Sequence, residues 1–153
     1  MYQKYTTEGF LVSARGSGEA DRLYLFYTHD FGMIFASARS VRSMKSKLRP
    51  HIMPGALLAL TLLKSKSRWM LLEAASVGEK LSAKSEGYKT FLKILLTLKA
   101  LAFGEERNES LFDSVLGAYK YLLKGEVTDL ASLECLAMVK ILHELTTLPQ
   151  AAR

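Results

Sequence analysis

The sequence predicts an α+β protein, with a five-stranded β-barrel over residues 1–80 followed by a three-helix bundle over residues 81–153. The first half alternates short β-branched and aromatic runs with glycine-containing turns. After Lys84 the apolar spacing changes from two residues to between three and four, which is typical of amphipathic helices. Because 49% of the residues are hydrophobic, we expect the chain to fold. A length of 153 residues suits one compact domain and also allows two small subdomains.

Five runs in the first half have the composition and length of strands: residues 9–14, 23–28, 33–38, 56–64 and 68–77. Turns punctuate them. Gly16-Ser17-Gly18 follows the first run, His29-Asp30-Phe31-Gly32 has the length of a tight hairpin loop, and Ser65-Lys66-Ser67 joins the last two runs. Pro50 and Pro54 keep the segment before the fourth run out of a central strand.

A five-stranded sheet of this size leaves exposed edges unless it closes on itself. The order of three strands, a long connection and a final hairpin favours an OB-type barrel, and an SH3-like barrel is the main alternative. We therefore expect an OB-type barrel in which the long connection lies between the third and fourth strands.

Three helices are expected in the second half. The first covers residues 86–103 and ends at Gly104, and the second covers residues 109–124 between the N-cap Asn108 and Gly125. The third begins at Thr128 or Asp129 and ends before Pro149. The short connections indicate an antiparallel bundle.

The net charge of +6 is unevenly distributed. Residues 1–72 contain eleven Lys and Arg against four Asp and Glu, a net charge of +7. Residues 73–153 contain ten against eleven, a net charge of −1. All the excess positive charge therefore belongs to the predicted barrel, which indicates a localised site for a polyanion.

The strongest single feature is the segment of residues 39–49, which has no acidic residue and several serines. Lys and Arg neutralise phosphates and release condensed counterions, while Ser hydroxyls add phosphate contacts that do not read sequence. We predict a nucleic-acid-binding loop, against the simpler interpretation of a solvated basic loop without a partner. Its five cationic residues are Arg39, Arg42, Lys45, Lys47 and Arg49.

Aromatic residues in the barrel half are candidates for stacking on unpaired bases. Tyr24 and Phe26 share one face of a strand by alternation, so the whole set cannot line one groove, and we expect one or two to touch a base. The set is Tyr24, Phe26, Tyr27, Phe31, Phe35 and Trp69.

The sequence contains no catalytic or metal-binding pattern. His29, His51 and His143 are scattered without metal-ligand spacing, and no nucleophile elbow or P-loop is present. We therefore expect no enzyme activity, no metal and no cofactor.

Other features of composition suggest a cytoplasmic protein. The single cysteine, Cys135, precludes an internal disulfide and is expected to be a buried apolar residue. The apolar runs are shorter than the roughly 20 residues of a membrane-spanning helix, and we expect no export signal and no membrane association. The acidic cluster around Glu105 and Glu106 is expected to be a solvated turn.

Several motifs together resemble the N-terminal domain of the RecO family of bacterial recombination mediators. The resemblance covers residues from about Thr7 to Val77. The last of the matching motifs is the basic segment up to Leu48-Arg49. The earlier motifs are Thr7-Glu8-Gly9-Phe10-Leu11-Val12-Ser13-Ala14-Arg15, Gly18-Glu19-Ala20-Asp21-Arg22-Leu23 and Thr28-His29-Asp30-Phe31-Gly32.

The resemblance implies an OB barrel and a helical domain that bind single- and double-stranded DNA, anneal complementary strands, and act with RecR and single-stranded-DNA-binding protein to load RecA. The implied DNA-contacting residues are the five cations of the basic segment, with Arg15 and Arg22 flanking the first turn. Ser40 stands where the family usually has glycine, which is expected to stiffen the loop.

Many relatives continue with a four-cysteine zinc module and further helices that this sequence lacks. We therefore expect a reduced partner surface, whether the chain is a natural short form or a fragment, and self-association through exposed apolar surface. Two other functions remain open: a protein-binding adaptor that works through its helical bundle, and an RNA-binding OB module.

Overall fold

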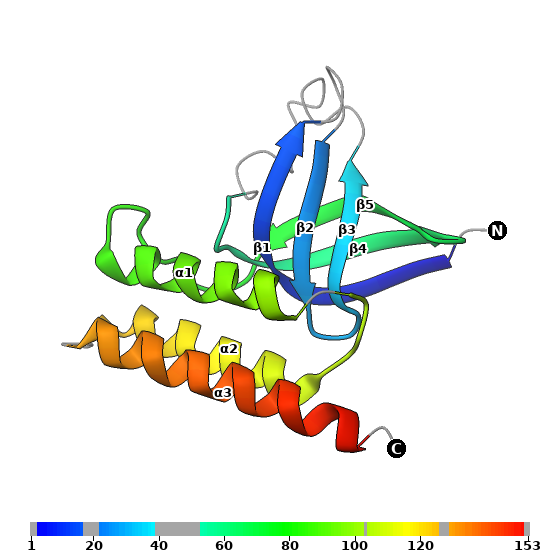
Figure 1. Cartoon of the computed structure of the whole chain (residues 1–153). Helices are drawn as coiled ribbons and strands as arrows, with labels where there is room; N and C mark the ends of the chain where they lie inside the picture. The colour runs from blue at the N-terminus through cyan, green and yellow to red at the C-terminus, as the bar shows by residue number, and fades with distance from the viewer. Residues whose placement is uncertain (1–2, 17–21, 39–52, 103, 126–128, 152–153) are drawn as a thin grey trace. The chain divides into compact units, whose positions relative to one another are not determined.

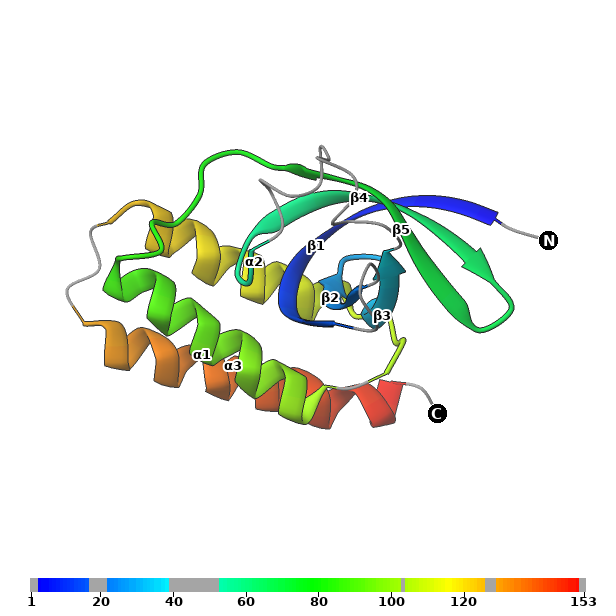
Figure 2. The same ribbon diagram turned by 90° about the horizontal axis from the view of Figure 1, so that it is seen from above.

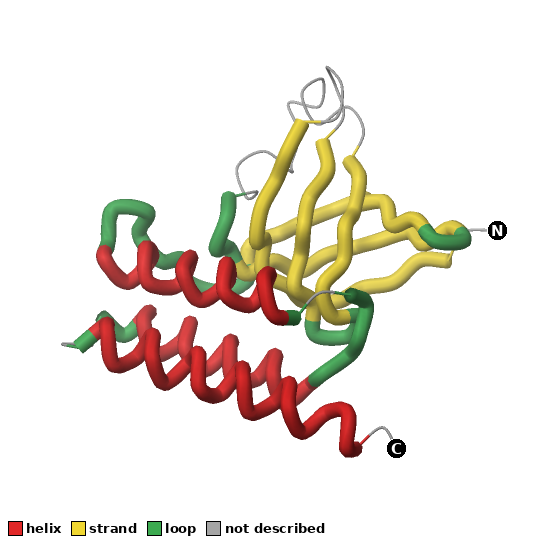
Figure 3. Tube along the Cα trace, viewed as in Figure 1, coloured by secondary structure: helices red, strands yellow, loops and turns green. Residues whose placement is uncertain are grey.

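The computed structural model describes residues 3–16, 22–38, 53–102, 104–125 and 129–151. Within these ranges five strands precede three helices, which confirms the α+β class (Figure 1, Figure 3). The chain divides into two compact units. The barrel unit consists of Met1–Gly78 with Gly104–Arg107, and the helical unit consists of Glu79–Phe103 with Asn108–Arg153.

The strands of the barrel unit pair in a closed circle. Their order is β1-β2-β3-β5-β4, and β4 pairs back onto β1. The β3–β5 pair is parallel and the other pairs are antiparallel. Figure 1 shows β1, β2 and β3 side by side, with β4 and β5 crossing them. The bounds are β1 Gln3–Gly16, β2 Arg22–Thr28, β3 Gly32–Ala38, β4 Leu57–Ser65 and β5 Arg68–Ser76.

The first strand is longer than the sequence predicted, because it begins at Gln3 and not at Gly9. Its first part, from Gln3 to Phe10, pairs with β4. Its second part, from Gly9 to Gly16, pairs with β2, and the register of that pairing shifts between Leu11 and Ser13. A strand that bends at a barrel corner can serve two neighbours in succession. The alternation of exposed residues with Tyr5 and Thr7 is the signal that was available for this extension.

The barrel interior is apolar because alternate residues of each strand point inward. Ile34, Ala36 and Ala38 of β3 are buried, as are Leu58, Leu60 and Leu62 of β4. Each fully buried Leu or Ile side chain contributes roughly 1.5–3 kcal/mol to folding. The interior of the barrel is thus a packed core and not a channel.

Each helix of the helical unit begins at a side-chain cap. Ser85 precedes α1 (Glu86–Leu101), Asn108 precedes α2 (Glu109–Leu123), and Asp129 precedes α3 (Leu130–Ala151). Each cap side chain accepts a backbone N–H three residues ahead, at 3.0–3.1 Å. These caps satisfy amides that the first helical turn leaves without partners. The three helices run alongside one another, as Figure 2 shows.

The end of α3 and the state of Cys135 differ from the predictions. The helix continues through Pro149 to Ala151, because a proline in the last turn removes one backbone hydrogen bond without blocking the few residues that remain. Cys135 is exposed and not buried, since the face of α3 that packs in the bundle carries Ala137 and Ile141 instead.

Candidate nucleic-acid interface

The ends of three strands meet at one end of the barrel. Gly16, the last residue of β1, pairs with Arg22, the first residue of β2, and Arg22 pairs with Ala38, the last residue of β3. In Figure 1 these ends lie together at the top of β1, β2 and β3. The register therefore places Arg15 and Arg22 at the same barrel end from which the chain continues into Arg39.

A patch of exposed and half-buried residues lies on the outer face of this end, and we call it the outer patch. Antiparallel pairing places Ser13 beside Leu25 and Phe35 in one row, and Arg15 beside Leu23 and Ser37 in the next. Leu25 is buried, whereas Phe35 is 52% exposed. The outer patch consists of Ser13, Arg15, Leu23, Phe35 and Ser37.

Arg15 crosses β2 to reach Phe35. Its guanidinium carbon lies 5.8 Å from the centroid of the Phe35 ring, within the range of a cation–π contact. Because β2 separates β1 from β3, the long arginine side chain must extend across Leu23 to make this contact. The contact places a positive charge at an exposed aromatic ring.

Arg22 lies on the opposite face of the sheet from Arg15, because their positions differ by one residue in the paired register. It is half-buried, and its guanidinium opposes the rise in the pKa of Tyr24 that burial causes. The structure thus brings the two arginines to one barrel end, on different faces.

The five cations of the basic segment, Arg39, Arg42, Lys45, Lys47 and Arg49, lie outside the described residues. The described strands on either side fix where this segment begins and where the chain returns. It follows Ala38 directly, and the chain is described again from Met53, before β4. DNA contact by these five residues stays a prediction.

The aromatic candidates separate clearly by exposure. Tyr24 and Phe26 share the inner face, as alternation predicted, with ring centroids 5.9 Å apart. Tyr27 and Trp69 are also buried, and Phe31 is half-buried. Among these six residues, all of which the structure describes, Phe35 alone is exposed.

The turn between β4 and β5 adds two cations that the sequence analysis did not select. Lys66 and Arg68 are both exposed, and Ser65 pairs with Arg68 across the turn. Lys66 has a φ of 49°, which is uncommon for a residue with a side chain. The available signal was the short run of serines and cations from Ser65 to Arg68, which we interpreted only as a turn.

The segment Gly104–Arg107, between α1 and α2 in the chain, belongs to the barrel unit. Glu105 accepts a 2.9 Å hydrogen bond from the Trp69 indole N–H and lies 3.2 Å from the Lys64 ammonium. The Lys64 ammonium also lies 4.8 Å from the centroid of the Trp69 ring. Glu105 is therefore a partner of the barrel, and the expectation of a purely solvated turn was wrong for it.

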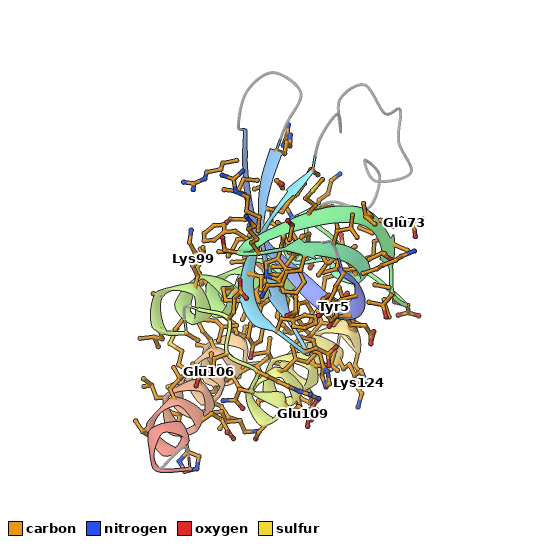
Figure 4. The ribbon with its side chains drawn as sticks, turned by 90° about the vertical axis from the view of Figure 1, so that its right-hand side faces the viewer. Tyr5, Glu73, Lys99, Glu106, Glu109 and Lys124 are labelled. Atoms are coloured by element: carbon orange, nitrogen blue, oxygen red, sulfur yellow. The ribbon has the colours of Figure 1, made fainter. Side chains whose placement is uncertain are left out.

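The backbone of this segment passes very close to the turn between β2 and β3. A Cβ added to Gly32 would lie 2.5 Å from the Glu106 carbonyl oxygen, and Gly32 has a φ of +67°. Met33 N–H also donates to the Gly104 carbonyl at 3.2 Å. Figure 4 labels Glu106 in this segment. Position 32 therefore has room only for glycine.

Asp30 joins three parts of the barrel unit. Its carboxylate accepts a 2.6 Å hydrogen bond from the Thr7 hydroxyl, lies 3.1 Å from the His29 ring, and lies 3.7 Å from the Arg107 guanidinium. The Thr7 hydrogen bond is the main cause that lowers the pKa of Asp30, with smaller contributions from His29 and Arg107. Burial opposes this shift.

The helical unit contains a groove of about 1140 Å³ between α2 and α3. Gly117 and Ala118, two residues with small side chains, are among the residues that line it. A Cβ at Gly117 would meet nothing within 4 Å. The lining includes three carboxylates, Glu109, Asp113 and Asp129, against one cation, Lys140. The groove is therefore acidic, in contrast to the cationic barrel end.

Within the described ranges, no group of three or more His, Cys, Asp or Glu residues is arranged to hold a metal ion. None of the helices described is long and apolar enough to cross a membrane.

Comparison with known proteins identifies the family. No curated protein matches the chain. The family model described as Recombination protein O N terminal matches residues 1–77, which is half of the chain and includes every barrel strand. The protein therefore belongs to the RecO family of DNA repair and recombination proteins.

Proposed function

We propose that the protein is a non-enzymatic recombination mediator that binds single- and double-stranded DNA through the cationic end of an OB-type barrel. One observation carries this proposal: the strand register gathers Arg15, Arg22 and the residue before Arg39 at one end of the family-matched domain. The proposed contacts are Arg15, Arg22 and the basic residues Arg39, Arg42, Lys45, Lys47 and Arg49.

The chemistry required of such a site is phosphate neutralisation. Lys and Arg bound to phosphates release counterions, so the affinity falls steeply as salt rises and depends little on base sequence. A mediator that binds both single strands and duplexes in this manner can hold complementary strands together for annealing. Cooperation with RecR and single-stranded-DNA-binding protein in loading a recombinase belongs to the same proposal, and family membership supports it.

The test compares two variants that lose the same charge. The loop variant combines Arg39→Ala, Arg42→Ala and Lys45→Ala. The control variant combines Lys84→Ala, Lys93→Ala and Lys124→Ala, three exposed residues of the helical unit. At low salt we expect the loop variant to lose about tenfold or more in affinity for single-stranded DNA, with little change in the control. Equal affinity of the loop variant and the wild type contradicts the site.

Whether the ligand is DNA or RNA needs a separate measurement, because a groove that binds the nucleic-acid backbone can accept either sugar. DNA and RNA oligonucleotides of one sequence should be competed against a labelled DNA strand. We expect DNA to compete at least as well as RNA, and consistently stronger competition by RNA favours the RNA-binding module instead.

The acidic groove between α2 and α3 favours a second candidate, a protein-binding adaptor. Its carboxylates disfavour an acidic peptide, and its glycine and alanine floor permits close approach of a helix. The partner chemistry that fits is a cationic amphipathic helix.

A synthetic Lys- and Leu-rich helical peptide tests this candidate. The wild type and the loop variant should both bind it, and Gly117→Leu should weaken binding, because the added side chain projects into open space in the groove. Ser13→Leu, on the barrel, is the matched control. Absence of binding by the wild type rules out the adaptor role of this groove.

A further inference from the structure

Among the aromatic residues of the barrel unit that the structure describes, Phe35 is unusual because it is exposed where its neighbours are buried. It is 52% exposed, whereas Ile34 and Ala36 on either side lie in the core. Burial of a phenyl ring is favourable, so an exposed ring in a well-packed barrel has no role in the core. Its exposed position makes the ring accessible to a ligand.

The surroundings of Phe35 suit a nucleotide. Arg15 brings a guanidinium to 5.8 Å from the ring centroid, and Ser13 and Ser37 flank the pair on the outer patch. An aromatic face beside a cation and hydroxyls offers a nucleobase a stacking surface and its phosphate a positive charge. The outer patch thus combines the two kinds of contact that single-strand-binding proteins use.

Phe35 also lies close to the start of the basic segment. It precedes Ala38 by three residues on β3, which corresponds to about 10 Å along an extended strand. A strand of DNA held by phosphates near the end of β3 therefore lies within reach of the ring. The outer face of β2 and β3 is also where OB barrels bind oligonucleotides.

We propose that Phe35 stacks on an unpaired nucleobase and that Arg15 neutralises the adjoining phosphate, which gives the protein a preference for single-stranded over double-stranded DNA. This inference rests on the proposed DNA-binding function and adds a discriminating contact to it. Bases within a duplex are already stacked on each other, so they do not offer a face to Phe35. Phosphate contacts exist in both forms, so Arg15 contributes to both affinities.

The alternative is that Phe35 is a surface residue shielded by the Arg15 side chain, without a ligand. In that case the Phe35 substitutions change neither affinity. A second alternative is that Phe35 supports the fold of the sheet. In that case they weaken binding of single strands and duplexes equally.

The experiment measures affinities for a single-stranded oligonucleotide and for the matching duplex by fluorescence anisotropy. Phe35→Leu keeps an apolar side chain without the aromatic face, and we expect it to lower single-strand affinity about tenfold or more and to change duplex affinity less than about twofold. Phe35→Trp should retain the wild-type affinities. Leu72→Ala, an exposed apolar position on β5, should leave both unchanged.

An oligonucleotide of abasic sites adds an independent readout. Removal of the bases should weaken binding by the wild type and have little further effect on Phe35→Leu, because the contact that the bases make is already lost. Arg15→Ala should weaken single-strand and duplex binding together.

The outcomes separate this inference from the function on which it rests. If Phe35→Leu retains single-strand affinity while the loop variant loses it, the stacking role is wrong and the DNA-binding site stands. If neither variant loses affinity, both are wrong. Equal losses for single strands and duplexes in Phe35→Leu also overturn the stacking role.

Discussion

The barrel unit and the helical unit differ in both charge and construction. The barrel holds a cationic end, an exposed aromatic ring and polar contacts from Glu105 and Asp30 that draw in the segment Gly104–Arg107. The helical unit is a capped, apolar bundle with an acidic groove. The difference teaches that one chain keeps a cationic barrel end apart from an acidic groove. If the proposed function is correct, DNA contact should depend on the barrel alone.

Two spectroscopic probes follow the two units separately. Trp69, the single tryptophan of the chain, lies in the barrel, so its fluorescence reports barrel unfolding. Far-UV circular dichroism is dominated by the helices, of which none lies in the barrel unit among the residues described. A substitution that changes unfolding in only one of the two signals supports the different construction of the two units. A substitution that changes both signals equally argues against it.

The largest expected effect on stability is that of Gly32→Ala. The substitution combines left-handed backbone strain with a clash against the Glu106 backbone, and we expect it to lower the free energy of unfolding of the barrel by about 3 kcal/mol or more. Urea titrations followed by Trp69 fluorescence measure it.

Substitutions at two other glycines distinguish backbone strain from the clash with Glu106. Gly78 has a φ of +64° with open space around it, so Gly78→Ala should show the strain alone, about 1 kcal/mol. Gly16 has open space and no positive φ, so Gly16→Ala should be nearly neutral. A Gly32→Ala effect no larger than that of Gly78→Ala would mean that Gly104–Arg107 does not pack against the turn.

A smaller effect is expected from removing Glu105. Glu105→Ala leaves the indole N–H of the buried Trp69 without its acceptor, and we expect a cost of about 1–2 kcal/mol in Trp69-monitored unfolding. Glu105→Gln keeps an acceptor and should recover most of it.

The matched change in the helical unit is Glu86→Ala. It removes an exposed pair with Lys89 and should cost no more than about 0.5 kcal/mol. A cost for Glu86→Ala as large as that for Glu105→Ala contradicts the different construction of the two units.

A further small effect is the pH dependence that Asp30 gives to the barrel. Its folded pKa is below the unfolded value, so its contribution to stability is fully present above about pH 4 and is lost as the pH falls through the lowered pKa. Because the carboxylate is partly exposed, the contribution should stay below about 1 kcal/mol.

Asp30→Asn should reduce the acid dependence of Trp69-monitored stability and leave that of the helical signal unchanged. An unaltered acid profile of the barrel would show that the contacts of Asp30 with Thr7 and Arg107 have no energetic weight.

The sequence was sufficient for features that depend on neighbours along the chain. The hairpin turn ending at Gly32, the cap Asn108, and the shared strand face of Tyr24 and Phe26 were all predicted, because local composition determines turns, caps and strand faces. The start of β1 was predicted less accurately, since Gln3 and its neighbours form a strand only through pairing with β4.

Features that depend on distant contacts were not predictable in the same way. Glu105 is 36 residues from its partner Trp69, and nothing in its local sequence distinguishes it from a solvated glutamate. The sequence named six aromatic residues as candidates for base stacking. Selecting Phe35 among them required knowledge of which strand face points outward, and the strand pairing provides it. The roles of Arg39, Arg42 and Lys45 remain a prediction from charge and family resemblance.

The most direct test of the central claim is the salt dependence of single-strand affinity. The logarithm of the binding constant should fall linearly with the logarithm of salt concentration, with a negative slope. The loop variant should reduce the magnitude of this slope by about 2, as expected for three lost phosphate contacts. The control variant, with three lysines of the helical unit removed, should keep the wild-type slope. A loop variant with the wild-type slope would contradict DNA binding at the cationic end of the barrel.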